Sequence, residues 1–64
     1  MQNETSHLEI PLGLGMALAQ NVNAMNHFAS MNRRAQQEIV SEARAVSSKA
    51  EMQRYVDSLD PTRS

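Results

Sequence analysis

Residues 48–61, with the sequence SKAEMQRYVDSLDP, hold the clearest structural signal in the chain. Ser48 and Glu51 have the spacing of a capping box, in which each side chain bonds a free backbone amide at the start of a helix. Apolar side chains follow at the helical spacing i, i+3, i+4 and i+7, at Met52, Tyr55, Val56 and Leu59. Pro61 lacks an amide hydrogen and disfavours helical geometry in the residue before it. We therefore predict a helix over residues 49–59.

The segment before this helix shows a longer amphipathic pattern. Asn32 can accept a hydrogen bond from the free amides of a following helix. Apolar side chains then recur on one stripe, at Ala35, Ile39, Ala43 and Val46, with Val40 beside them. A single apolar stripe is typical of a surface helix with one buried face, and we place this helix at 33–46.

A shorter helix is expected at 22–30, with Asn21 as its N-cap. Its apolar face is expected to hold Val22, Met25, Phe28 and Ala29. Phe28 is the only phenylalanine in the chain, and we expect its ring at the centre of the core.

A first helix is expected at about 12–20. Proline is tolerated in the first turn of a helix, where Pro11 stands, and Leu14, Ala17 and Leu18 then fall on one side. Gly13 and Gly15 weaken a helix by about 1 kcal/mol each relative to alanine. Either this helix starts late, near Gly15, or the glycines let another backbone approach closely.

No alternating run of β-branched or aromatic residues predicts a strand. Four short helices joined by one- to three-residue turns must fold back on one another, so we predict an all-α fold, a compact array of four short helices. The single helical domain is expected to span residues 10–60. Residues 1–9 are polar and aperiodic and are expected to form a disordered arm, and residues 61–64 a frayed tail.

The chain is short for a stable fold. Its 64 residues form at most one domain, and a domain of this size buries only a modest fraction of its surface. The sequence contains no cysteine, which excludes disulfides and thiolate metal sites. Self-association is therefore the first additional source of stability to expect.

Charge is unevenly distributed along the chain. The net charge is −1, from six basic and seven acidic residues, so the chain has no electrostatic reason to bind nucleic acid or an anionic membrane. Residues 10–32 contain no Asp, Glu, Lys or Arg, which suggests that this half faces other protein. A secretory signal needs a positively charged start, and no Lys or Arg precedes residue 10. A membrane span needs about 20 apolar residues, and polar side chains from Gln20 onward interrupt the apolar run earlier. We therefore expect a cytoplasmic protein.

Residues 10–21, IPLGLGMALAQN, resemble the opening phrase of a group of short, uncharacterised bacterial proteins, chiefly from anaerobic Firmicutes. Those proteins begin with a Leu-Pro-x-Gly-x-Gly-Met-Ala-Leu-Ala-Gln-Asn phrase. They end with a phrase similar to residues 48–59 here, SKxEMQxxVxxL. The resemblance covers residues 10–59 and implies a bacterial source and a shared fold, but no function.

A second resemblance is to the C-terminal helical segment of the YdeI/OmpD-associated family. The matching positions are Ala17, Leu18, Asn21, Ala24, Phe28 and Met31. Val22 stands where that segment has a proline, and the family's later Trp-Ile and arginine-rich positions have no counterpart here. The family is linked loosely to bacteriocin protection. The resemblance implies the helical layout and no site residue.

Residue types that support catalysis or metal binding are sparse. His7 and His27 are the only histidines, whereas a zinc site needs three or four ligands. Glu38 and Glu42 are neighbours on a helix, and paired carboxylates can do acid–base work, but such a pair is usually a solvated face. With so small a core we expect no deep cleft, and therefore no enzymatic activity, no cofactor and no metal.

The last two helices also suggest a helix-turn-helix motif. That motif usually has a glycine in its turn, and residues 44–48 contain none. The second helix would expose two acids beside two bases, which would repel and attract phosphate about equally. Because the two helices still have this arrangement, a small DNA-binding or antitoxin-like regulator is kept as the alternative function. A membrane-surface amphipathic protein is the third, and it lacks the basic polar face that anionic lipid favours.

Methionine is frequent in the predicted helices, at Met16, Met25, Met31 and Met52. Methionine fills irregular gaps in a core, which is the commoner use, and it also lines adaptable binding surfaces. We predict a small non-catalytic protein-interaction module that binds a protein partner or a second copy of itself. Its candidate interaction surface consists of Leu12, Leu14, Met16, Met25 and Met31.

Overall fold

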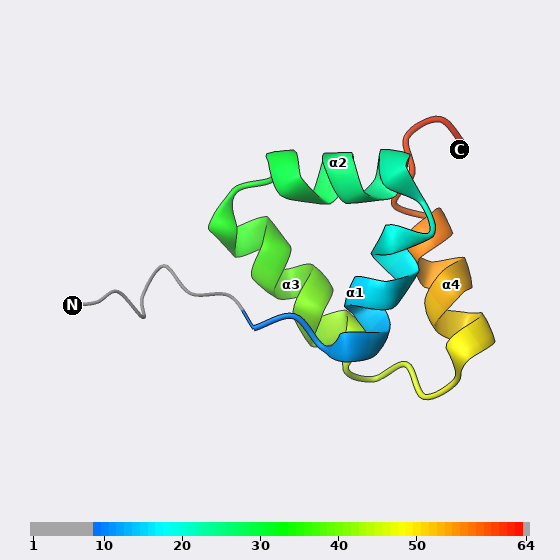
Figure 1. Ribbon diagram of the computed structural model, residues 1–64. Helices are drawn as coiled ribbons and strands as arrows, with labels where there is room; N and C mark the ends of the chain where they lie inside the picture. The colour runs from blue at the N-terminus through cyan, green and yellow to red at the C-terminus, as the bar shows by residue number, and fades with distance from the viewer. Residues whose placement is uncertain (1–8, 64) are drawn as a thin grey trace.

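Four helices make up the regular structure of residues 9–63, the part of the chain that the computed structural model describes. They are α1 (Leu12–Ala19), α2 (Val22–Ser30), α3 (Arg33–Ala43) and α4 (Lys49–Asp57). No strand occurs among the described residues, and Figure 1 shows the predicted all-α array of four short helices. Most of the arm predicted at residues 1–9 lies outside the described residues.

Side-chain caps begin three of the four helices. Asn21, Asn32 and Ser48 each accept a hydrogen bond from the backbone amide three residues later, at 2.9–3.0 Å. These bonds satisfy amides that the start of a helix leaves free, and they confirm the three predicted N-caps. Pro11 precedes α1 without a side-chain cap, and its carbonyl accepts from the amide of Gly15 at 2.9 Å.

The helix ends differ more from prediction than the starts. α2 has the predicted bounds and α1 is one residue shorter, but α3 ends at Ala43 instead of residue 46 and α4 at Asp57 instead of residue 59. Beyond each end the chain continues in tighter turns, in which the Val46 and Leu59 amides bond carbonyls three residues back at 3.0 and 2.9 Å. Both side chains still pack against the core, so apolar spacing alone overestimates the helices. The α3–α4 connection, residues 44–48, is longer than predicted.

The C-terminal residues form a turn where a frayed tail was predicted. Residues 61–63 are in a turn conformation, and the Arg63 amide bonds the Asp60 carbonyl at 3.1 Å. The buried Asp60 carboxylate accepts from both the amide and the hydroxyl of Thr62, at 2.8 and 2.6 Å. An aspartate that bonds its own backbone two residues on fixes a turn locally, and a search for apolar periodicity does not detect it.

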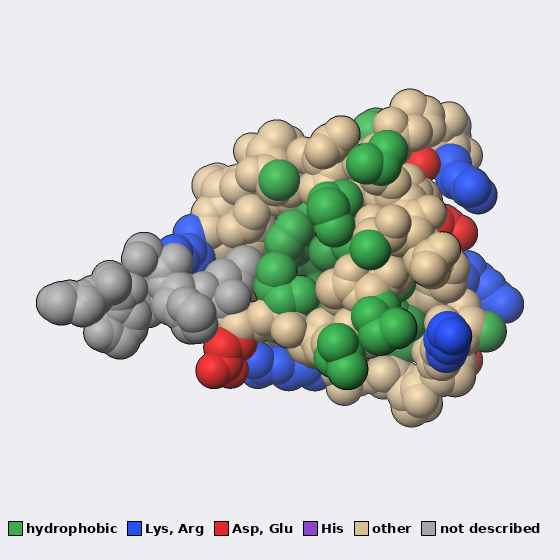
Figure 2. All heavy atoms as spheres, in the orientation of Figure 1, with side chains coloured by type: hydrophobic (Ala, Val, Ile, Leu, Met, Phe, Trp, Pro, Cys, Tyr) green, Lys and Arg blue, Asp and Glu red, His purple; other side chains and the backbone are tan. Residues whose placement is uncertain are grey.

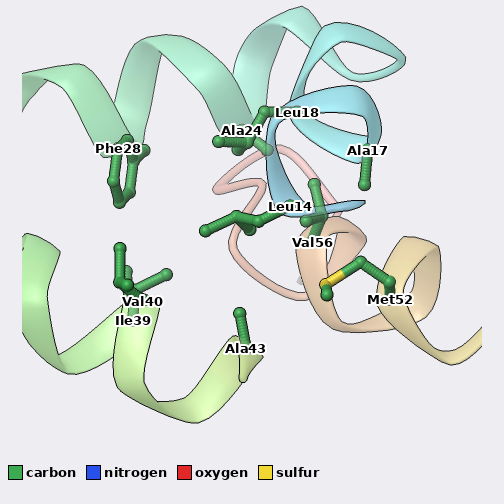
Figure 3. Close-up of a cluster of buried hydrophobic side chains, with 10 residues drawn as sticks. All are labelled: Leu14, Ala17, Leu18, Ala24, Phe28, Ile39, Val40, Ala43, Met52 and Val56. Atoms are coloured by element: carbon green, nitrogen blue, oxygen red, sulfur yellow. The ribbon is translucent and has the colours of Figure 1, made fainter. Parts of the chain in front are cut away.

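The core lies between all four helices, and α1 packs directly against both α4 and α2. Figure 3 shows the buried apolar side chains: Leu14, Ala17, Leu18, Ala24, Phe28, Ile39, Val40, Ala43, Met52 and Val56. The predicted common interior is therefore present. Leu14 and Val56 are fully buried, and Leu14 projects into the middle of the cluster. Phe28 is buried, but it faces α3 at one side of the cluster and does not occupy the centre (Figure 3).

The buried face of α2 differs from the predicted one. Ala24 and Phe28 are buried, whereas Val22 and Ala29, which were expected on this face, are exposed. The small side chain of Ala24 lies at the contact with Leu18 of α1 (Figure 3). The close contact between α1 and α2 therefore requires a small side chain at Ala24, a position that the apolar spacing did not include in the buried face.

Two leucines of α1 provide a matched test of this packing. Leu14→Ala removes a fully buried side chain from the middle of the core and should cost about 2–5 kcal/mol of unfolding free energy. Leu12→Ala changes a side chain that is 77 % exposed and should cost within about 0.5 kcal/mol. Urea unfolding followed by circular dichroism measures both.

The volume-conserving Leu14→Met variant should lose less than about 1.5 kcal/mol, which keeps the test informative if Leu14→Ala does not fold. Equal losses for the two alanine variants would contradict the described position of α1.

Candidate interaction surface

No side chain of α1 is polar. The helix reads LGLGMALA, and a helix that is apolar all round is normally covered on every side. Here Leu14, Ala17 and Leu18 are buried, and the opposite side is not covered. This uncovered side of α1 is the strongest candidate for a binding surface among the described residues.

Leu12 and Met16 form the uncovered side, with exposed fractions of 77 % and 53 %. They are four residues apart and therefore neighbours on the helix surface. Ile10 and Val22 are also large exposed apolar residues. Figure 2 shows hydrophobic side chains gathered in the middle of one face of the molecule, while charged side chains lie around its edge.

An open groove of about 910 Å³ lies beside this side of α1, and we call it the α1 groove. Its two walls are α1, through Leu12, Gly13, Met16, Ala17 and Gln20, and the α3–α4 connection with the start of α4, through Val46, Ser47, Ser48, Lys49, Ala50, Met52 and Gln53. A Cβ atom placed on Gly13 would lie 3.7 Å from the Met52 methyl carbon. Among the described lining residues Lys49 alone is charged, so the groove offers mainly apolar contact.

The structure brings together only part of the predicted interaction surface. Leu12 and Met16 lie on the α1 groove. Leu14 is a correction, because it is fully buried in the core and unavailable to a partner. Two residues along a helix turn the side chain to the opposite side, which separates Leu14 from Leu12. Met25 and Met31 are half-buried against the core and do not line the groove.

Sequence reasoning missed the second wall of the groove. Val46 and Met52 were assigned to the core stripes of two helices, and Met52 is indeed buried. They also border the groove because the α3–α4 connection places them beside α1, more than 25 residues away in the chain. No local pattern contains that information.

A polar cluster joins the start of α2 to the end of α4. Asn21 is buried, and in addition to capping α2 it donates from Nδ2 to Oδ1 of Asp57 at 3.1 Å. Gln53 donates to the same oxygen at 3.2 Å and to the Ala17 carbonyl at 3.3 Å. These hydrogen bonds, first that from Asn21 and then that from Gln53, lower the pKa of the Asp57 carboxyl. The cluster ties α1, α2 and α4 together.

A second polar contact joins α3 to α4. The Tyr55 hydroxyl donates to Oε1 of Glu42 at 2.9 Å, and its ring packs against the core. Partial burial, followed by the hydrogen bond to Glu42 and the negative charge of that residue, raises the pKa of Tyr55 above its ordinary value. The hydroxyl therefore keeps its proton at neutral pH and acts as a hydrogen-bond donor. Glu42 of the Glu38–Glu42 pair is thus engaged in a structural bond.

Within residues 9–63, no three His, Asp or Glu side chains gather in a way that could hold a metal ion. His27 is exposed on α2, and His7 lies outside the described part of the chain. None of the helices described has the length and apolar character required to cross a bilayer.

Comparisons with protein-family models, with curated proteins and with solved structures found no match to this chain. The resemblances noted from short sequence phrases therefore stay predictions.

The two asparagine caps allow the Asn21–Asp57 bond to be tested. Serine is also a good N-cap residue, so Asn21→Ser and Asn32→Ser should both keep their caps. Asn21→Ser also removes the amide that donates to Asp57, whereas the bond that Asn32 makes is the cap bond from the Ala35 amide. We expect Asn21→Ser to cost more unfolding free energy than Asn32→Ser at pH 7.

The excess cost should depend on pH. A carboxyl whose pKa is lowered by folding contributes stability above its unfolded pKa of about 3.9, and this contribution is lost as the pH falls through the lowered value. The difference between the two serine variants should therefore shrink below about pH 4. Urea unfolding between about pH 2.5 and 7 measures it. A difference that stays constant over this range would show that Asp57 is not involved.

Proposed function

We propose that this protein is a small, non-catalytic interaction module that binds another protein chain through the uncovered side of α1 and the α1 groove. One observation supports the proposal above the others: a helix without a polar side chain leaves Leu12 and Met16 exposed beside an apolar groove. The cysteine-free composition is compatible with the reducing cytoplasm, where we propose that the module acts.

The energetic reason is the cost of leaving apolar surface in water. Burying a leucine or methionine side chain contributes about 1.5–3 kcal/mol relative to leaving it exposed. Leu12 and Met16 make little of this contribution within the chain, because most of their surface is exposed. A partner that covers both would gain it, and the nearly uncharged groove would add little desolvation cost.

The distribution of charge supports a protein partner over nucleic acid or a membrane. Binding to phosphates requires several basic side chains on one surface, and Figure 2 shows Lys and Arg at separate points around the edge of the face. A helix that lies on anionic lipid needs Lys or Arg beside its apolar side. α1 contains neither, and Lys49 is the one basic group among the described residues that line the groove.

Site-specific photo-cross-linking in cells that naturally produce the protein tests this proposal. A photoreactive amino acid at position 12 or 16 should give a discrete cross-linked protein adduct, because both positions border the groove. The same amino acid at Gln37, which is exposed on α3 and does not line the groove, is the matched control and should give none. Equal yields from all three positions, or no adduct from positions 12 and 16, would contradict the proposal.

A further inference from the structure

We propose that residues 58–63 form an acid-released strap: the ionised Asp60 carboxylate holds it closed over the α1–α2 corner, and protonation opens it while the four helices stay folded. Figure 1 shows the chain after α4 turning back beside the start of α2. The inference concerns a different part of the molecule from the α1 groove and is independent of the proposed function.

Asp60 is the residue that holds the strap in shape. Its exposed fraction is 3 %, and it is the one charged residue among residues 9–63 that is buried. A buried carboxylate needs hydrogen bonds or an opposite charge to compensate for the water that it loses. It accepts from the amide and the hydroxyl of Thr62, at 2.8 and 2.6 Å. Hydrogen bonds to an ionised oxygen are shorter and stronger than neutral ones, so protonation of Asp60 weakens both.

The closed strap also supports the start of α2. Asn23 of α2 donates from Nδ2 to the Thr62 hydroxyl at 3.4 Å, and the Asn21 side chain favours the charged form of Asp60. α2 has no acidic residue in its first turn, whereas the N-terminus of a helix favours negative charge. Asp57, which accepts from Asn21 at 3.1 Å, and Asp60 provide that charge from a distant part of the chain. Neutral carboxyls would lose this attraction.

Few charged groups face the Asp60 carboxylate. Arg63 of the strap lies 3.7 Å from Asp60 and 3.9 Å from Asp57 of α4. Its side chain is 61 % exposed, and ion pairs of exposed side chains contribute little. α1 and α2 contain no Asp, Glu, Lys or Arg, and His27 stands in the last turn of α2, at the other end from Asn21. The hydrogen bonds to the carboxylates, more than the ion pairs, therefore keep the strap closed.

The direction of the pH dependence follows from these bonds. The hydrogen bond from the Thr62 hydroxyl is the main cause that holds the pKa of Asp60 below its ordinary value, although burial alone would raise it. A carboxyl with a lowered pKa stabilises the closed strap above the ordinary value of about 3.9, and this contribution is lost as the pH falls through the lowered value.

The helices should remain folded when the strap opens. The buried cluster that joins them consists of apolar side chains, which do not titrate. Of the strap residues, Leu59 alone packs against this cluster. Segments with few buried apolar contacts open at a lower free-energy cost than the core does. We therefore expect residues 58–63 to open below about pH 4 as a local unit.

Backbone amide order parameters, measured by NMR on the whole chain from pH 7 to about 2.5, test this inference. The Arg63 amide is a suitable reporter, because it bonds the backbone carbonyl of Asp60 at 3.1 Å and not the carboxylate that titrates. The order parameters of Thr62 and Arg63 should fall from about 0.8 to below about 0.6. Those of Leu14 and Val56, the fully buried core residues, should stay near about 0.85.

Two matched substitutions separate Asp60 from other carboxyls. Asp60→Asn keeps the size and one acceptor oxygen of the side chain but removes its charge. At pH 7 this variant should have the open strap that the parent has in acid, and acidification should open it no further. Glu38→Gln neutralises an exposed carboxyl on α3, outside the strap. It should leave both the order of the strap at pH 7 and the pH of its opening unchanged.

Three outcomes would overturn the inference. The first is a strap that stays ordered after the carboxyl signal of Asp60 shows that it has taken up a proton. The second is an Asp60→Asn variant that is as ordered as the parent at pH 7. The third is a loss of order in the helices together with the strap, in the parent at low pH or in Asp60→Asn, because the strap would then belong to one cooperative unit. No strap residue lines the α1 groove, so these outcomes leave the proposed function untouched.

Discussion

The burial of α1 against α4 and α2 is the contact on which the rest of the structure depends. Leu14 projects from α1 into the middle of the core, and Val56 of α4 is the other fully buried large side chain. Ten apolar side chains make up the buried cluster of residues 9–63, and Phe28 is the one aromatic residue among them. A core this thin has little redundancy, so α2 and α3 would lose their common packing surface without α1.

Asn21 extends this contact from the core to the polar end of the molecule. Its oxygen accepts from the first turn of α2 while its amide donates to Asp57 at the end of α4. One side chain therefore fixes both where α2 begins and how the α1–α2 corner sits on α4. A buried asparagine needs both functions, because an unpaired amide in the interior would cost more free energy than the cap returns.

The local features of this fold could be predicted from the sequence, and the distant ones could not. Asn21, Asn32 and Ser48 were predicted as caps because a cap depends on the three residues that follow it. The apolar stripes predicted which helices share a core, but they ran past the ends of α3 and α4, since residues in a tight turn can also pack inward.

Contacts between distant segments were beyond local patterns. The bond from Asn21 to Asp57 spans 36 residues. The second wall of the α1 groove comes from the α3–α4 connection and the start of α4, and apolar spacing had placed Val46 of that wall inside a helix. Leu14 was predicted to share one side of its helix with Ala17 and Leu18 and was also included in the candidate interaction surface, whereas it is fully buried. Amphipathic contrast is what separates inside from outside in a sequence, and α1 has none.

Because α1 is apolar on every side, one side of the helix packs into the core while the other leaves apolar side chains exposed. α1 has eight residues, two of them glycine, and no side-chain cap, so it would not persist as an isolated helix in water. Its inward side chains hold it in place, and a partner on its outward side would add apolar contact to the same two turns. Any partner that binds only folded α1 stabilises the whole domain by mass action. Under the proposed function, a partner on the exposed side of α1 would therefore also stabilise the fold of a chain whose core is this small.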